Sequence, residues 1–152
     1  MLPTPKRYTL VAGAAEGHSE LNAFDNALLN SGIGNLNLIK ISSILPPEAV
    51  FTANLEIPPG SLIPTAYGST ISSQPGELIA AAVGVGLSKN TFGIIMEYSG
   101  ACSQAEAEAE VTRRVEEAFS RRNLPLSKLV IKAAEHRVAQ IGSVFAGVAL
   151  WY

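Results

Sequence analysis

Two adjacent serines, Ser42 and Ser43, lie where the apolar segment 35–41 runs into a Pro-Pro corner. Each proline fixes its own φ and disfavours helix at the residue before it, so Leu45 and Pro46 are expected to be extended. A serine hydroxyl held in such a segment can be aimed at the carbonyl before it, as chain self-cleavage by an N→O acyl shift requires. The alternative is two loop serines that cap local backbone amides.

Asp25 is a candidate binding residue on a predicted helix, residues 20–30. Leu21, Phe24 and Leu28 recur there at i, i+3 and i+7, and Asp25 falls inside this apolar stripe at i+4. A buried carboxylate needs a cation, a set of donors or an opening to a cavity. The cations considered for an internal salt bridge are Lys40, Arg7 and Arg137. The other interpretation is a pocket carboxylate that binds a cationic ligand, for which a planar guanidinium is well suited.

Glu97 is a candidate proton donor in the predicted strand 93–98. The three residues before it, Ile94, Ile95 and Met96, are apolar, so few polar groups are expected beside it. Burial would raise the pKa of Glu97, and the carboxyl could then keep a proton near neutral pH and act as a general acid. The alternative is a glutamate at the end of a strand that reaches solvent.

Asn37 has the same strand parity as Ile39, Ile41 and Ser43, which predicts a side chain facing the same way as the second serine. Six residues of strand span roughly 20 Å, so Asn37 could meet a Ser43 only across a subunit boundary unless the chain folds back. The alternative is an amide that bonds the backbone at the start of a strand.

These residues must be positioned by a mixed set of elements. Ser103 and Glu106 form a capping box that begins a helix ending near Arg122, and the helix 20–30 stops at Ser31-Gly32. The strand-like segments are residues 10–13, 36–41, 62–72, 78–87, 93–98, 128–134 and 144–151. Two helices and about seven strands predict an α+β fold.

The composition favours one domain with a real core, since 152 residues are 47% hydrophobic and 16% charged. A net charge of −2 without a basic cluster excludes the usual nucleic-acid or membrane-surface binder.

The single Cys102 fits a reducing compartment, and residues 1–7 lack a secretory signal, so a cytoplasmic protein is expected. His18 and His136 have no ligand-spaced neighbours, so no metal site is expected.

Three segments, residues 21–35, 41–48 and 93–100, together resemble the pyruvoyl-dependent arginine decarboxylases. The resemblance covers nearly the whole chain, from residues 10–13 to 149–152, with the segments in the order and at about the spacing of that family. It implies a layered αββα sandwich that assembles as a trimer, or a dimer of trimers, with sites between neighbouring subunits.

The resemblance also implies a self-made cofactor. Ser43 Oγ would attack the carbonyl of Ser42, and β-elimination followed by hydrolysis would leave a pyruvoyl group at position 43. One domain, residues 1–152, would thus become a β chain of residues 1–42 and an α chain of residues 43–152. No separate cofactor would be needed.

The resemblance further assigns roles in converting L-arginine to agmatine and carbon dioxide. The pyruvoyl ketone would form a Schiff base with the α-amine and act as an electron sink. By the resemblance, Glu97 returns a proton after carbon dioxide leaves, Asp25 binds the guanidinium, and Asn37 assists processing or catalysis.

Two alternatives remain open at this point. Asn26 stands beside Asp25 where a small residue is common in the family, and one pocket carboxylate does not exclude lysine or ornithine as substrate. The second alternative is an unprocessed, catalytically silent trimer that serves as a binding or structural protein.

Overall fold

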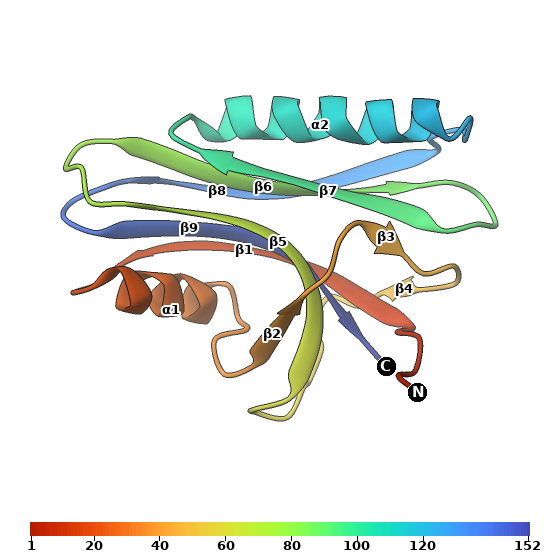
Figure 1. Cartoon of the computed structure of the whole chain (residues 1–152), viewed down its shortest axis with the longest axis horizontal. Coiled ribbons are helices and arrows are strands. Elements are labelled where there is room, and N and C mark those ends of the chain that lie inside the picture. The colour runs from red at the N-terminus through yellow and green to blue at the C-terminus, as the bar shows by residue number, and fades with distance from the viewer.

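Two β-sheets packed face to face lie between two helices in the computed structural model, which describes all 152 residues (Figure 1). Helix α2 covers the four-stranded sheet, and helix α1 covers the five-stranded sheet. This arrangement confirms the α+β class and the layered αββα sandwich. The elements are β1 (Arg7–Glu16), α1 (Glu20–Asn30), β2 (Asn37–Lys40), β3 (Ile44–Leu45), β4 (Val50–Phe51), β5 (Leu62–Ser72), β6 (Leu78–Leu87), β7 (Gly93–Gly100), α2 (Gln104–Arg121), β8 (Lys128–Arg137) and β9 (Gly142–Trp151).

The strand order is β2-β5-β9-β1-β4 in the five-stranded sheet and β3-β7-β6-β8 in the four-stranded sheet. Most neighbours are antiparallel, and the pairs β1–β4 and β2–β5 are parallel. Strand β1 pairs with β9 along its whole length, from Arg7 opposite Trp151 to Glu16 opposite Gly142. The N-terminal strand therefore lies in the interior of a sheet built largely from later residues.

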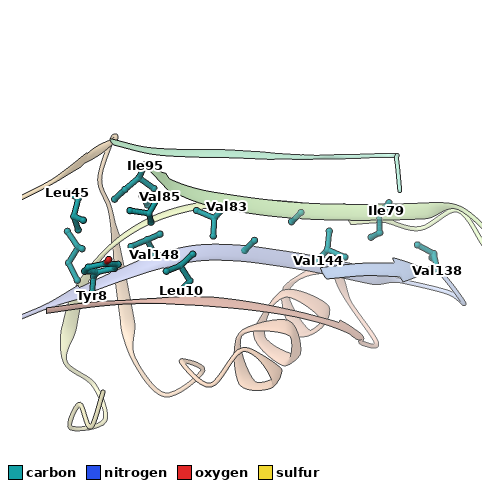
Figure 2. Close-up of a cluster of buried hydrophobic side chains, with 14 residues drawn as sticks. Tyr8, Leu10, Leu45, Ile79, Val83, Val85, Ile95, Val138, Val144 and Val148 are labelled. Carbon is teal, nitrogen blue, oxygen red and sulfur yellow. The ribbon is translucent and has the colours of Figure 1, made fainter. Parts of the chain in front are cut away.

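The main core fills the space between the two sheets (Figure 2). Strand β6 is covered on both faces, which explains its unbroken apolar sequence. Val83 and Val85 pack toward the five-stranded sheet, whereas Ala80 and Ala82 pack toward α2. A strand buried on both faces has no reason to alternate with polar residues.

Helix α2 begins with the predicted capping box, in which Ser103 and Glu106 each accept from the backbone amide of the other. Its apolar face is narrow and packs closely on β6. A Cβ added to Gly84 would lie 2.6 Å from Val111 Cγ1, and one added to Gly86 would lie 2.5 Å from Phe119 Cε2. The glycines in β6 therefore let the helix approach the sheet. Neither helix is long and apolar enough to cross a membrane.

Helix α1 has the predicted bounds but presents a different face to the sheet. A Cβ added to Gly13 of β1 would lie only 2.8 Å from the carbonyl oxygen of Ala27, so the backbones are in close contact. Only small side chains fit there, and Ala23 and Ala27 are fully buried. Phe24 and Leu28 pack on the sheet as predicted, whereas Leu21 and Asp25 are exposed, so the prediction that Asp25 lies inside the buried stripe is wrong.

The strand predictions match the bounds of β5 and β6 and differ at the ends of the other long strands. Strands β1, β7 and β8 extend beyond the predicted segments, and β2 is shorter than predicted. The two-residue strands β3 and β4 were not predicted. Both depend on pairing with distant strands, β3 with β7 and β4 with β1.

Candidate functional site

The serine pair lies where the chain crosses from one sheet to the other between β2 and β3 (Figure 1). Before the crossing, the amide of Ile41 donates to the carbonyl of Thr65 on β5 at 3.1 Å. After it, the amide of Ile95 on β7 donates to the carbonyl of Ser43 at 2.7 Å. Ser42 is exposed and Ser43 is half-buried. The Ser42–Ser43 peptide bond is thus an accessible link whose two sides are fixed to different sheets.

A cavity of about 300 Å³ opens beside this peptide bond. Its walls include Leu2 from the N-terminus, Pro64 from β5 and Tyr152 from the C-terminus, together with both serines. The sequence carries no local signal for the contribution of Leu2 or Tyr152, because the chain ends meet the serines only in the folded protein.

Glu97 lies on β7 with its side chain between the two sheets. It pairs with Val83 of β6, and its Cγ would lie 3.4 Å from a Cβ added to Gly68 of β5. Burial raises the pKa of Glu97, while the positive charges of Lys40 and Arg114 act in the opposite direction. The predicted rise in the pKa is confirmed in direction, so the side chain has the character expected of a general acid.

Ser43 and Glu97 are brought together by β7. The residue that bonds the Ser43 carbonyl, Ile95, precedes Glu97 by two positions on the same strand. Side chains two residues apart point to the same face of a strand, and Ile95 belongs to the core between the sheets. The serine and the glutamate therefore belong to one local arrangement within one chain.

Asn37 is exposed at the start of β2, where its Nδ2 donates to the carbonyl of Gly60 at 3.0 Å. This is the alternative interpretation from the sequence, an amide that bonds backbone. The parity argument linking Asn37 to Ser43 is wrong, because β2 ends at Lys40 and Ser43 is bonded to the other sheet. No hydrogen bond joins Asn37 to Ser43 within the chain.

Asp25 is exposed on α1 and forms no salt bridge. The cations considered as partners are engaged elsewhere. Arg7 and Arg137 donate to backbone carbonyls, and Lys40 lies over the ring of Tyr67. The carboxylate of Asp25 is consequently free to meet a cation from outside the chain.

Several large apolar side chains are exposed on the segments around the serine pair. Ile39 on β2 and Leu62 on β5 are 45% and 62% exposed, and Ile44, directly after Ser43, is 41% exposed. Strands β2 and β3 belong to different sheets, and these side chains are left outside the core that the sheets enclose. Neighbouring exposed apolar side chains are typical of a surface that binds a protein.

His136 on β8 is hydrogen-bonded to Glu16 at the end of β1. Its Nε2 lies 2.6 Å from Glu16 Oε2, and the Glu16 carboxylate also accepts from the amides of Ala139, Gln140 and Ile141. These contacts tie the end of β1 to the β8–β9 turn. Both carboxylate oxygens of Glu16 are occupied by these hydrogen bonds, so Glu16 has a structural role.

Known proteins similar to this chain share one description. A family model described as pyruvoyl-dependent arginine decarboxylase matches residues 7–148. The protein of that name from Methanocaldococcus jannaschii is 50% identical over 150 residues, which cover 97% of this chain and 91% of the relative. The protein of that name from Methanococcus maripaludis strain C7 is 46% identical, with 97% and 92% covered. That from Pyrococcus abyssi is 48% identical over 135 residues, with 87% and 85% covered.

Proposed function

The chain belongs to the pyruvoyl-dependent arginine decarboxylase family, and from this premise we propose that it converts L-arginine to agmatine and carbon dioxide, using a pyruvoyl group made from its own Ser43. The observation that carries the proposal is the hydrogen bond from the amide of Ile95 on β7 to the carbonyl of Ser43, because Ile95 lies two positions before Glu97 on that strand. The cleavage point is thus bonded to the strand that carries the candidate proton donor.

The residues at the crossing fit a pyruvoyl group at position 43. The hydrogen bond from Ile95 is to the carbonyl of Ser43, which stays on the C-terminal fragment after cleavage. The new N-terminal group would therefore keep its anchor on β7. Ser42 is exposed, so its new carboxylate could be solvated.

Cleavage would proceed through groups of the chain itself. Ser43 Oγ attacks the carbonyl carbon of Ser42, and the hydroxyl proton passes to the Ser43 nitrogen as an ester replaces the peptide bond. Elimination removes the Cα proton of residue 43, breaks its Cβ–Oγ bond and releases Ser42 as a carboxylate. Tautomerisation and attack by one water then release ammonia and leave a ketone at residue 43.

The pyruvoyl group supplies an electron sink for the loss of carbon dioxide from an α-amino acid. Glu97 would hold the proton that the product carbon takes up, because burial raises its pKa. Asp25 would bind the guanidinium with a planar pair of hydrogen bonds, which its freedom from internal partners permits. Asn37 would assist processing or catalysis through its amide.

We further propose that the site is completed between copies of the chain. Asp25 and Asn37 form no hydrogen bond with Ser43 in their own chain, and both are exposed. The apolar side chains of Ile39 and Leu62 lie exposed on β2 and on β5 beside it. A trimer, alone or paired as a hexamer, would bury these groups and bring residues of one subunit to the serine of the next.

The two fragments, residues 1–42 and 43–152, would stay together after cleavage. Strand β1 pairs with β9 along its whole length and with β4 on its other side, and α1 packs over the same sheet. The cut therefore falls outside the ladders that hold β1. With Cys102 as its only cysteine, the protein has no internal disulfide and would suit the reducing cytoplasm.

The proposal is tested by combining denaturing mass spectrometry with an assay of product. Two fragments divided after Ser42, the larger blocked at its N-terminus, and release of carbon dioxide with agmatine from arginine are expected. A persistent full-length chain without activity would instead indicate a silent homologue. Equal turnover of lysine or ornithine would reject arginine as the preferred substrate.

Mass photometry of the wild type and Leu62→Lys would report the assembly, with a smaller species expected for the variant.

A further inference from the structure

Two cations lie near Glu97, and each is held against an aromatic ring. Lys40 Nζ lies 4.7 Å from the centroid of the Tyr67 ring, and Arg114 Cζ lies 4.9 Å from that of Tyr98. Both cationic residues are exposed, and the cation–π contact favours a position of each charge beside its ring. Lys40 was considered from the sequence only as a partner for Asp25, and Arg114 was not considered as a site residue, because the partners of each come together only in the folded protein.

Arg114 reaches from α2 to the backbone of Glu97. Its Nη1 donates to the Glu97 carbonyl at 2.9 Å, and its Nε donates to Glu110 Oε1 at 2.9 Å. Strand β3 pairs with β7 only at Gly93 and Ile94, so the edge of β7 has no neighbouring strand at Glu97. Arg114 therefore supplies there one of the hydrogen bonds that a further strand would have made.

Lys40 approaches from the opposite sheet. It is the last residue of β2, three positions before Ser43, and it lies on the ring of Tyr67. The residue after Tyr67 is Gly68, whose missing side chain leaves room for Glu97, since a Cβ added there would lie 3.4 Å from Glu97 Cγ. Lys40 is therefore close in sequence to the serine pair, and its charge also acts on the carboxyl of Glu97.

The other elements packed on Glu97 bring no further charge to it. Gly68 faces it from β5, and Val83 pairs with it on β6. Lys132 lies in the same row on β8, opposite Val83, and is thus two strands away. Lys40 and Arg114 are the charges that lower the pKa of Glu97 against the effect of its burial.

We propose that Lys40 and Arg114 are positioning residues for Glu97, which fix its strand and its electrostatic surroundings and so set the pH range over which it donates a proton. The inference rests on the proposed function. A general acid works best when its pKa is close to the working pH. Burial raises the pKa of Glu97, and the two cations held near it act in the opposite direction and limit that rise.

The test replaces each cation by a neutral side chain of similar length, in Lys40→Met and Arg114→Met. Either change should move the titration midpoint of Glu97 upward by about half to one pH unit, and the double variant should move it further. The midpoint is read by carbon-13 NMR of glutamate carboxyls, with the Glu97 signal assigned by its absence in Glu97→Gln. This readout does not need an active enzyme.

The same variants are then assayed for decarboxylation across pH. Because Glu97 must be protonated to act, the alkaline limb of the kcat profile should move up with the NMR midpoint. Arg114→Lys should restore the limb, since it keeps the charge. It should not restore the full rate at low pH, because an ammonium cannot reproduce the rigid, planar contacts of the guanidinium with Glu110 and the Glu97 carbonyl.

Arg113→Met and Lys132→Met are the matched controls. Arg113 pairs with Glu110 but makes no contact with Glu97, and Lys132 lies two strands away. Shifts of equal size in the controls, or no shift in Lys40→Met and Arg114→Met, would overturn the inference. An NMR shift without a matching kcat shift would also overturn it, whereas a wild type that lacks decarboxylation would reject the proposed function alone. If Arg114→Met does not fold, the NMR midpoint and the kcat profile of Lys40→Met and Arg114→Lys still test the inference.

Discussion

The amide of Ile95 donates a hydrogen bond of 2.7 Å to the carbonyl of Ser43, and this bond attaches the serine crossing to β7. It joins residues far apart in sequence and places Ser43 beside the strand that carries Glu97. The acceptor is the carbonyl on the C-terminal side of Ser43, so the contact would survive a cut between Ser42 and Ser43. The same bond can therefore hold residue 43 before and after processing.

Ser43→Ala should remain one full-length chain without decarboxylase activity. Alanine has no hydroxyl to attack the carbonyl of Ser42, and no leaving group for the elimination that would form the ketone. Denaturing mass spectrometry would measure the cleavage, and release of carbon dioxide would measure the activity. The fold should be kept, because Ser43 contributes to the sheet through its backbone carbonyl.

Ser42→Ala serves as the matched variant. Only the carbonyl of residue 42 takes part in the proposed attack, so this variant should still be cut between residues 42 and 43. If Ser43→Ala were cut and Ser42→Ala were not, the assignment of the two serines would have to be reversed.

Glu97→Gln should lower kcat by about 10²- to 10⁴-fold, the usual contribution of a positioned general acid. In the wild type, burial raises the pKa of Glu97, and the protonated form is the active one. Activity should therefore be retained at low pH and decline as the pH rises through this elevated pKa. Plots of kcat against pH would show this decline for the wild type and not for Glu97→Gln.

Cleavage must be followed in the same samples, so that lost turnover is not confused with lost processing. Glu116→Gln, an exposed carboxylate on α2, is a suitable control and should leave the profile unchanged. A Glu97→Gln protein that is cut normally and turns over like the wild type would remove Glu97 from the mechanism.

The sequence predicted most of the fold because the long strands and both helices carry strong local patterns. The unbroken apolar run of β6 and the capping box at Ser103 are visible without any tertiary contact. The two-residue strands β3 and β4 have no such pattern. They exist because β7 and β1 offer them partners, and sequence periodicity does not contain that information.

The candidate site was predictable in part, and its errors have physical causes. Glu97 was correctly expected to have a raised pKa, since its neighbours in β7 are apolar. Asp25 was wrongly placed in the core, because the close approach of α1 to Gly13 turns its small alanines inward. The roles of Lys40 and Arg114 depend on contacts between separate elements, which a linear pattern does not show.

Asp25→Asn should reduce kcat/KM for arginine by about ten- to a hundredfold, the cost of losing a charged partner in a hydrogen-bonded pair. Most of the loss should appear in KM, because the guanidinium is remote from the bond that breaks. Steady-state kinetics with arginine, lysine and ornithine would measure it. Glu20→Gln, an exposed carboxylate on the same helix, should have little effect. An unchanged preference for arginine in Asp25→Asn would mean that another group binds the guanidinium.

Glu16→Gln should lower the free energy of unfolding at neutral pH by about 1 to 2 kcal/mol, because a carboxylate that accepts several hydrogen bonds loses its charge. Burial would raise the pKa of Glu16, but the amides of Gln140, Ala139 and Ile141 and the His136 side chain outweigh burial and lower it to about 2.

A pKa that is lower in the folded protein than in the unfolded chain stabilises the fold above the unfolded value, near 4.5, and this contribution is lost as the pH falls toward about 2. Chemical denaturation of the wild type and Glu16→Gln should therefore show a gap that is constant above about pH 5 and closes through this window. Glu116→Gln should show no such gap. If the gap were independent of pH, the carboxylate would act through packing and not through its charge.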